Sequence, residues 1–133
     1  MTEQPPTVFV IEDDLETRNA TELLLSVSGF ATLCFESAES LLDSAESLAR
    51  LTTSHCVCVL ADLRLPGLNG LQLFQRLRND GIAAPVILIS GHADNETIEQ
   101  ATDAGVDEFL LKPVRPDYLI ATLRSATQRD AAA

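Results

Sequence analysis

The sequence has few of the residues from which disulfide frameworks and structural metal sites are built. Only three cysteines occur in 133 residues, and there is no tryptophan. Cys34, Cys56 and Cys58 are odd in number and lie in apolar runs, so we expect small buried thiols in a reducing compartment rather than disulfides. Cys56 and Cys58 would face opposite sides of a strand, which argues against a metal shared between them.

Basic residues are also scarce. Nine Lys and Arg stand against 20 Asp and Glu, which gives a formal net charge of −11. This charge repels the phosphate backbone of nucleic acids and the surface of anionic membranes. We therefore expect no direct nucleic-acid binding by this chain and no membrane partner, and we expect its ligands to be cations or basic surfaces.

Long hydrophobic runs are missing as well. No apolar stretch approaches the roughly 18 to 20 residues that span a bilayer. Residues 1–7 are polar and contain Pro5 and Pro6, so they lack the basic start and apolar run of a secretory signal. These features predict a cytoplasmic protein.

The composition that remains is that of one globular domain. The chain is 46% hydrophobic and 22% charged, with six glycines and six prolines, and its length suits one core and not two. We expect a single domain over residues 1–133, with its core at about residues 7–127. Residues 128–133 read as a tail or as the start of a linker.

Short apolar or β-branched runs alternate with longer segments of helical spacing. The expected strands are 7–11, 31–35, 56–61, 85–89 and 107–111. The expected helices are 14–28, 37–48, 71–78, a short helix that Asp94 or Asn95 opens and that closes before Gly105, and 116–127. This alternation is typical of right-handed crossovers on a parallel sheet. It predicts an α/β fold of the flavodoxin-like (βα)5 type, a doubly wound sheet of five parallel strands in the order 2-1-3-4-5.

Two helices carry specific expectations. In the first, Leu23, Leu24 and Val27 are predicted to form the stripe that packs on the core, and Gly29 to end the helix. In the second, Ser37 is predicted to cap one continuous helix that ends at about residue 48.

Chemically active side chains follow four of the five predicted strands. They are Glu12, Asp13, Asp62, Ser90 and Lys112. Because the carboxyl ends of parallel strands meet at one edge of the sheet, these side chains should converge there. Several carboxylates with one amine repel one another unless they bind a cation, and oxygen ligands left partly open to water favour Mg²⁺.

The same cluster suits an anion that carries a phosphoryl group. With Mg²⁺ and Lys112 neutralising charge, Asp62 can attack phosphorus as a nucleophile and become an aspartyl phosphate. Ser90 is placed to hydrogen-bond one phosphoryl oxygen and Lys112 to pair with another. The sequence thus predicts a Mg²⁺-dependent phosphoacceptor at Asp62.

Four motifs in this order resemble the receiver domains of bacterial two-component response regulators. The motifs are Ile11-Glu12-Asp13-Asp14 with Arg18, Ala61-Asp62-Leu63-Arg64-Leu65-Pro66 with Gly70, Ile89-Ser90-Gly91-His92, and Phe109-Leu110-Leu111-Lys112-Pro113. The resemblance covers about residues 7–127. Around Asp62 and Ser90 it is closest to receivers of helix-turn-helix transcription factors of the nitrogen-fixation type.

The resemblance implies roles for individual residues. Glu12 and Asp13 would hold Mg²⁺ together with Asp62 and the backbone carbonyl of Arg64. Glu12 stands where Asp is usual, so its longer side chain would reach the metal through water.

Ser90 and Phe109 would form the switch, which reshapes the surface made by the helix after residue 94, the last strand and the last helix. Phe109 lacks the hydroxyl that a tyrosine would carry there. The implied partners are a sensor histidine kinase, a second copy of the chain after phosphorylation, and an output that controls transcription.

Simpler interpretations stay open for several of these residues. The acids at 12–14 could be the negative start of a helix, Asp62 a turn residue, and Lys112 an ordinary strand exit. His55 is expected at the surface, and His92 could influence the access of water to the phosphoryl group. Asp94, Glu96 and Glu99 are expected to form a solvated helix face, with a docking surface for a basic partner as the alternative.

Two other functions compete with a signalling switch. A small phosphatase with an aspartyl nucleophile would need a substrate cap, and no insertion is long enough to make one. A flavin-binding protein would need Gly, Ser or Thr donors after the first strand, where this chain is acidic. The sequence does not decide whether the receiver acts alone or precedes a DNA-binding output domain.

Overall fold

The structure is a computed structural model, and it describes residues 5–91 and 95–132, the last four of these through the backbone alone. The strands are β1 (Thr7–Ile11), β2 (Ala31–Phe35), β3 (Val57–Asp62), β4 (Val86–Ser90) and β5 (Glu108–Leu111). The helices are α1 (Leu15–Val27), α2 (Ala38–Leu42), α3 (Ala45–Thr53), α4 (Gly70–Asn79), α5 (Asn95–Ala104) and α6 (Pro116–Ala132).

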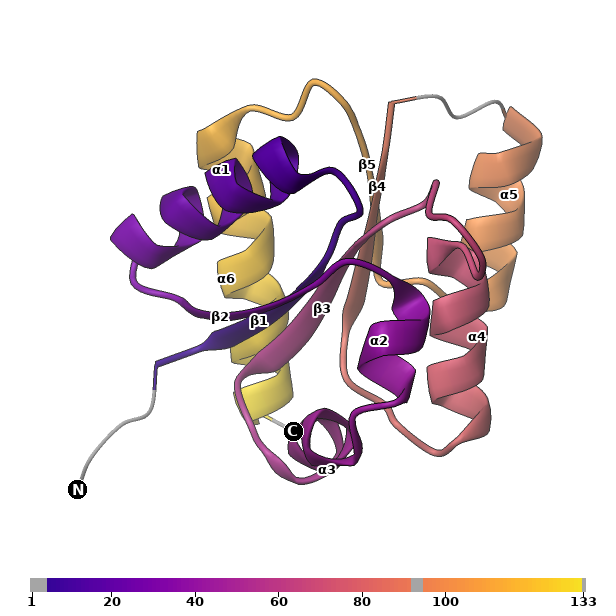
Figure 1. The fold of residues 1–133 in the computed structure, drawn as a ribbon, viewed down its shortest axis with the longest axis horizontal. Coiled ribbons are helices and arrows are strands. Elements are labelled where there is room, and N and C mark those ends of the chain that lie inside the picture. Colours follow the sequence, from indigo (N-terminus) through magenta and orange to yellow (C-terminus); the bar gives the residue numbers. More distant parts are fainter. Residues whose placement is uncertain (1–4, 92–94, 133) are drawn as a thin grey trace.

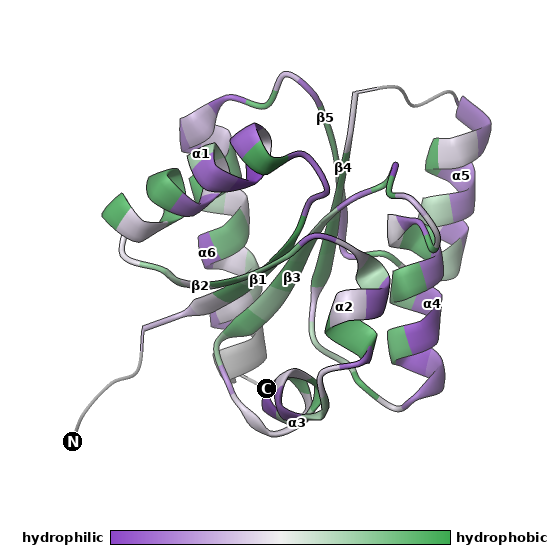
Figure 2. Ribbon diagram, viewed as in Figure 1, coloured by the Kyte–Doolittle hydropathy of each residue, from purple (hydrophilic) through white to green (hydrophobic). Residues whose placement is uncertain are grey.

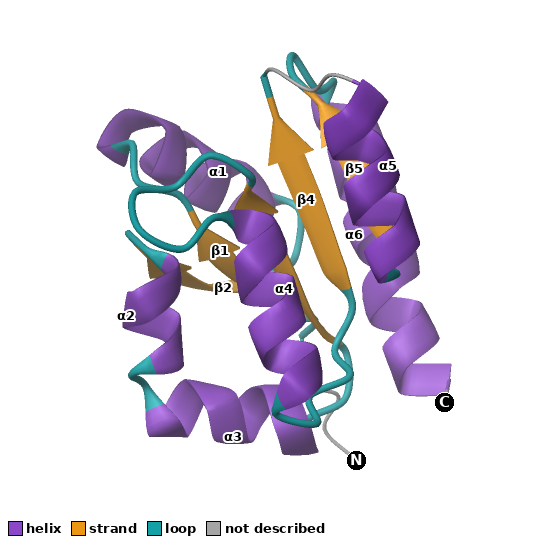
Figure 3. Ribbon diagram, turned by 90° about the vertical axis from the view of Figure 1, so that its right-hand side faces the viewer, coloured by secondary structure: helices purple, strands orange, loops and turns teal. Residues whose placement is uncertain are grey.

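All five strands pair in parallel, in the order β2-β1-β3-β4-β5. Helices α1 and α6 cover one face of the sheet, and α2, α3, α4 and α5 cover the other (Figure 1). The predicted doubly wound (βα)5 sheet and its strand order are confirmed. In Figure 3 the arrow of β4 ends at the edge where the loop before α6 also lies, so loops from different parts of the chain gather at the carboxyl ends of the strands.

The central strands are apolar because helices cover both of their faces. Every residue of β1 and β3 is buried, and alternate residues enter different cores. Phe9 and Val59 pack with α2 and α4, whereas Val8 and Leu60 pack with α1 and α6. Figure 2 shows this as a hydrophobic sheet between helices that carry both hydrophobic and hydrophilic residues. Such two-sided burial is the usual state of a parallel sheet.

The predicted core stripe of α1 is wrong in two of its three residues. Leu23 and Val27 are 66% and 73% exposed, whereas Leu25 is fully buried and Leu24 is only partly buried. Residues two apart on a helix are separated by about 200°, so burying Leu25 turns both Leu23 and Val27 toward solvent. Three consecutive leucines surround most of the helix, and their spacing alone could not tell which one faces the sheet.

The single helix predicted for residues 37–48 is two helices, so the described chain has six helices and not five. The side-chain oxygen of Ser37 accepts a hydrogen bond from the Ser40 amide at the start of α2. The oxygen of Ser44 does the same for the Ser47 amide at the start of α3. A second cap of this kind ends the first helix and redirects the chain.

Other boundaries differ by smaller amounts. Strand β3 begins at Val57, because Cys56 has a backbone φ of +60° outside the strand, so the predicted alternation of Cys56 and Cys58 within one strand does not hold. Cys58 is buried, Cys34 and Cys56 are half-buried, and all three are free thiols. Helix α6 continues to Ala132, past the predicted end at 127. Within the described residues no helix has the length and apolar character needed to cross a membrane.

Candidate functional site

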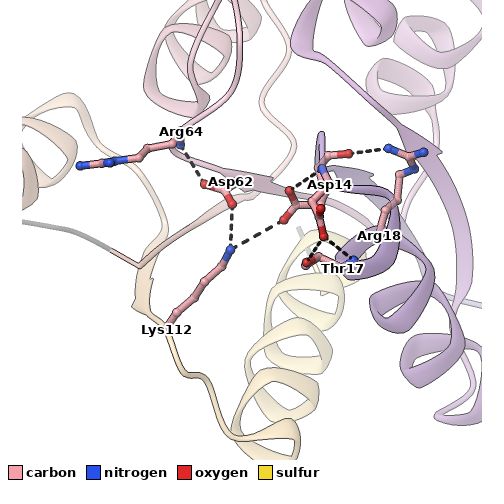
Figure 4. Close-up of polar contacts among 7 residues, drawn as sticks. Asp14, Thr17, Arg18, Asp62, Arg64 and Lys112 are labelled. Atoms are coloured by element: carbon pink, nitrogen blue, oxygen red, sulfur yellow. Dashed lines mark hydrogen bonds and ion pairs between the residues drawn. The ribbon is translucent and has the colours of Figure 1, made fainter.

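Three charged side chains meet at the carboxyl ends of β1, β3 and β5. The Lys112 ammonium, one residue past β5, lies 2.9 Å from Asp62 Oδ2 and 3.7 Å from Glu12 Oε1 (Figure 4). Glu12 and Asp62 are both buried. The register explains the meeting, because Ile11 of β1 lies beside Ala61 of β3 and each acid is the next residue. The predicted convergence of residues 50 and 100 positions apart is therefore present.

The backbone around Glu12 holds that side chain in place. Its Oε2 accepts a hydrogen bond from the Asp14 amide at 3.1 Å, and its carbonyl oxygen accepts one from Arg18 Nη1 at 2.8 Å. Asp14 is the N-cap of α1, and its Oδ2 accepts hydrogen bonds from both the amide and the hydroxyl of Thr17. The simple helix-start interpretation therefore applies to Asp14, whereas Glu12 points to the Lys112 ammonium.

The segment that follows Asp62 in the chain contacts both its side chain and its backbone. Its Oδ1 accepts a hydrogen bond from the Arg64 amide at 2.8 Å, and the Arg64 guanidinium points away from the site (Figure 4). Gly70 begins α4 against the Asp62 backbone, and a Cβ on it would lie 2.7 Å from the Asp62 carbonyl oxygen. Only glycine allows α4 to start this close to the acid.

Ser90 and Phe109 lie on the neighbouring strands. Ser90 ends β4 and is fully buried, and its carbonyl oxygen accepts a hydrogen bond from the Lys112 amide at 2.8 Å. The preceding Ile89 pairs with Asp62, so Ser90 is one residue past the acid on the adjacent strand. Phe109 of β5 is partly buried against the core that also contains α4 and α5. The Lys112–Pro113 peptide bond is cis.

Burial and charge alter the acid–base properties of this site. Burial raises the pKa of Glu12 to about 7, and the negative charge of Asp62 and a hydrogen bond with Asp13 add to this, against the Asp14 amide and Lys112, which lower it. Burial also lowers the pKa of Lys112, but its hydrogen bond and charge pairing with Asp62 and Glu12 outweigh this, so its pKa lies above the ordinary value. The ammonium is fully charged at neutral pH and pairs with both carboxyl groups.

The raised pKa of Glu12 predicts a pH-dependent stability. The folded protein keeps the Glu12 proton up to about pH 7, whereas the unfolded chain loses it near its ordinary value of 4.5. The folded state therefore binds more protons in this window, and the free energy of unfolding should fall by on the order of 2 kcal/mol as the pH rises through it. Glu12→Gln should lack this fall.

Urea unfolding at pH 4.5 and pH 7.5 in EDTA measures the difference. All other titrating groups are common to the two proteins, so the difference between wild type and variant isolates Glu12. The same pH dependence in both proteins would contradict the raised pKa.

The donor chemistry at this edge fits a magnesium ion. Within residues 5–91 and 95–132, no three His, Cys, Asp or Glu side chains are grouped closely enough to hold a metal by themselves. Mg²⁺ usually takes only one or two carboxylates and keeps several waters. Glu12 and Asp62 are two hard oxygen donors, and the Lys112 ammonium contacts both of them. Exposed Asp13 adjoins them.

A small cavity of about 40 Å³ lies beside the charged cluster. Its lining includes Glu12, Asp62 and Lys112, together with Thr17 and Thr21 of α1. Pockets for organic ligands are usually about 300 to 1,000 Å³. This space suits a water-sized guest rather than a flavin or a phosphate ester with a large organic part.

The structure thus brings Glu12, Asp62 and Lys112 into contact, with Ser90 and Arg64 attached through their backbones and Asp13 beside Glu12. Their chemical roles stay predictions. His55 is exposed, as expected, and so are Glu96 and Glu99. His92 and Asp94 lie outside the described residues. Sequence reasoning missed Thr17 and Thr21 at the cavity and Glu39, whose contact with the loop after Asp62 has no local signal.

Comparison with known proteins identifies the family. The response regulator receiver domain family matches residues 8–124. The chain is 32% identical over 122 residues to the transcriptional regulatory protein FixJ of Bradyrhizobium diazoefficiens, covering 92% of this chain and 57% of that protein. It is 36% identical over 123 residues to nodulation protein W of the same organism, covering 92% and 52%.

A solved structure of full-length FixJ from B. japonicum has a TM-score of 0.81 at 32% identity, covering 97% of this chain and 60% of that chain. The chain spans about half the length of these relatives. The chain therefore belongs to the response regulator receiver domain family, the phosphorylation-controlled switch domains of two-component signalling.

Proposed function

We propose that Asp62 accepts a phosphoryl group from the phosphohistidine of a sensor histidine kinase. The observation that carries this proposal is the environment of its carboxylate, buried between the Arg64 amide at 2.8 Å and the Lys112 ammonium at 2.9 Å. In the transfer, a carboxylate oxygen of Asp62 forms a bond to phosphorus while the bond between phosphorus and the donor nitrogen breaks. Lys112 then pairs with a phosphoryl oxygen, and Ser90 hydrogen-bonds another.

Glu12, Asp13, Asp62 and the Arg64 carbonyl would hold Mg²⁺ at this edge. The ion, when bound, supplies positive charge that offsets the negative charge of the phosphoryl oxygens. Glu12 and Lys112 contribute from the chain itself. Lys112 pairs with both acids, and the raised pKa of Glu12 means that its deprotonated form, which binds a cation better than the protonated form, is reached only near neutral pH. The domain would catalyse only its own phosphorylation and dephosphorylation.

The test is phosphorylation by a small donor without any kinase. Acetyl phosphate with Mg²⁺ should add one phosphoryl group per chain, measured by intact-protein mass spectrometry, and EDTA should prevent it. Removing the ion leaves the anionic donor facing excess carboxylate charge. Equal labelling in EDTA would reject the metal-dependent mechanism.

We propose that the switch controls transcription. We place the protein in the cytoplasm. The relatives FixJ and nodulation protein W are about twice as long as the matched region, and FixJ is named as a transcriptional regulator. This favours a receiver that acts on a DNA-binding domain. A stand-alone receiver that works through protein contacts is the alternative, and the length of the native protein separates the two.

Ser90 and Phe109 would transmit the conformational change caused by phosphorylation to a surface formed by α5, β5 and α6. On this surface β5 is an edge strand of the described sheet, and apolar side chains are exposed, with Leu111 at 52% and Tyr118 at 53% exposure. Such features suit the docking of a second copy of the chain after phosphorylation has changed the conformation. Sedimentation with beryllofluoride and Mg²⁺ should give about twice the monomer mass, and an unchanged mass would speak against dimers.

A phosphatase with Asp62 as nucleophile is the second candidate, because such an enzyme needs a carboxylate nucleophile with a cation beside it, and Lys112 lies beside Asp62. The 40 Å³ cavity beside Asp62 leaves little room for an organic phosphate ester. Multiple turnovers on small phosphate esters would favour the enzyme, and a single turnover per chain favours the switch.

A further inference from the structure

A contact 29 residues apart in sequence joins α2 to the loop that follows Asp62. The Oε2 atom of Glu39, in the first turn of α2, accepts a hydrogen bond from the Leu68 amide at 2.9 Å. The loop passes so close that a Cβ on Gly67 would overlap Glu39 Oε2. Gly67 has a φ of +76°, in the left-handed region that favours glycine. This bond lowers the pKa of Glu39 below its ordinary value.

The contacted loop, residues 63–69, contains the backbone amide that hydrogen-bonds Asp62. Near its start, the Arg64 amide donates to Asp62 Oδ1 at 2.8 Å. At its end, the Gly70 amide donates to the Leu63 carbonyl at 3.1 Å, which closes the loop on itself. The Glu39 contact at Leu68 lies between these two points. A displacement of the loop at Leu68 therefore acts on both.

The side of α2 that faces inward is firmly anchored. Ala38 and Leu41 are fully buried in the same core as Leu63 and Leu65 of the loop. Ser37 caps the helix through the Ser40 amide. Glu39 itself is exposed. Its carboxylate thus links a fixed helix to the loop through a hydrogen bond.

The chain contains a second glutamate, Glu46, in the same local sequence as Glu39. The pentapeptide Ser-Ala-Glu-Ser-Leu occurs twice, at 37–41 and at 44–48, and each copy starts a helix with its serine as N-cap. Glu39 and Glu46 occupy the same helical position and are both exposed. Of the two, among the residues that the structure describes, only Glu39 bonds to the loop after Asp62. The difference arises from tertiary structure and not from local sequence.

From these contacts we infer that Glu39 is a positioning residue for the phosphoacceptor site. By holding Leu68, it keeps the Arg64 backbone against Asp62 and so sets how well the acid is oriented for phosphoryl transfer. The inference rests on the function proposed for Asp62. A residue that only stabilised α2 would change the melting temperature and leave the site unaffected.

The experiment compares Glu39→Ala, Glu39→Gln and the matched control Glu46→Ala in the full chain. One measurement is the initial rate of phosphorylation by acetyl phosphate at saturating Mg²⁺, at a temperature where every variant is folded. The other is the exchange rate of the Arg64 amide hydrogen without metal, followed by NMR. Losing one hydrogen bond to a loop should slow phosphorylation and speed exchange by about threefold to tenfold in Glu39→Ala.

Glu39→Gln should show a smaller effect, because its amide oxygen can still accept from Leu68, and Glu46→Ala should match wild type. A wild-type phosphorylation rate in Glu39→Ala overturns the inference, whatever its melting temperature, and so does an equal loss in Glu46→Ala. If wild type itself is not phosphorylated, the proposed function fails. The Arg64 exchange rate then decides by itself whether Glu39 positions the loop.

Discussion

Asp62→Asn is expected to abolish labelling by acetyl phosphate in the presence of Mg²⁺. Asparagine has nearly the same shape as aspartate, but its amide cannot form the acyl phosphate. Its oxygen can still accept the hydrogen bond that the Arg64 amide now gives to Asp62 Oδ1. The loss of the negative charge also removes the partner that Lys112 contacts at 2.9 Å. Intact-protein mass spectrometry should show no added phosphoryl group.

The matched control is Asp103→Asn, which changes an exposed aspartate on α5. It should be labelled to the wild-type extent. Thermal melting of both variants checks that each is folded. Persistent labelling of Asp62→Asn would falsify the assignment, and peptide mapping would then locate the true acceptor among the neighbouring acids.

Leu25→Ala is expected to cost about 3 to 5 kcal/mol of the free energy of unfolding, whereas Leu23→Ala should change it by less than about 0.5 kcal/mol. The two substitutions remove the same atoms from the same helix. Leu25 is fully buried in the core between α1, α6 and the sheet, and Leu23 is 66% exposed. A cavity forms only at Leu25, and surrounding side chains cannot fully close it.

Urea denaturation at one pH measures both variants against wild type. The slope of the free energy with urea should be unchanged, because the surface exposed on unfolding is nearly the same. Comparable losses in the two variants would mean that α1 is rotated relative to the face assigned here. The predicted stripe of Leu23, Leu24 and Val27 would then regain support.

The error in α1 shows what periodicity leaves undecided. The positions of Leu23, Leu24 and Leu25 establish that the segment is an apolar-faced helix, and α1 does run from Leu15 to Val27. Which leucine faces inward depends on how the helix is rotated when it packs on β1, β3 and α6. That rotation is set by contacts with residues as far along the chain as Leu123, and local spacing holds no information on it.

The split between α2 and α3 has a different cause. Its signal was present in the sequence, because Ser44 repeats the capping serine of Ser37 seven residues later. A repeat of seven residues also suits two turns of one continuous helix, so the two interpretations compete locally. The structure decides for two helices, because the Ser44 side chain accepts a hydrogen bond from the Ser47 amide and so starts α3 as a separate helix.

The candidate site was predictable to the extent that it depends on strand ends. Glu12, Asp62 and Lys112 each come at the end of a strand-forming run of largely apolar residues, and parallel pairing brings such positions to one edge whatever the details of the loops. Their pairing distances and the raised pKa of Glu12 were not predictable, because both depend on burial and on side-chain rotamers. Glu39 gave no signal at all, since the same five residues recur at Glu46 without the contact.

The amino-acid sequence alone determined the alternation of strands with helical segments, the parallel sheet and the set of acids, hydroxyl and amine at its carboxyl edge. These follow from short-range patterns and from the topology that parallel strands permit. Tertiary structure alone decided which face of α1 is buried, where the chain turns between α2 and α3, and which of two identical glutamates reaches the loop after Asp62. Those outcomes depend on contacts between segments far apart in the chain, whose energies are not encoded in any one of the segments.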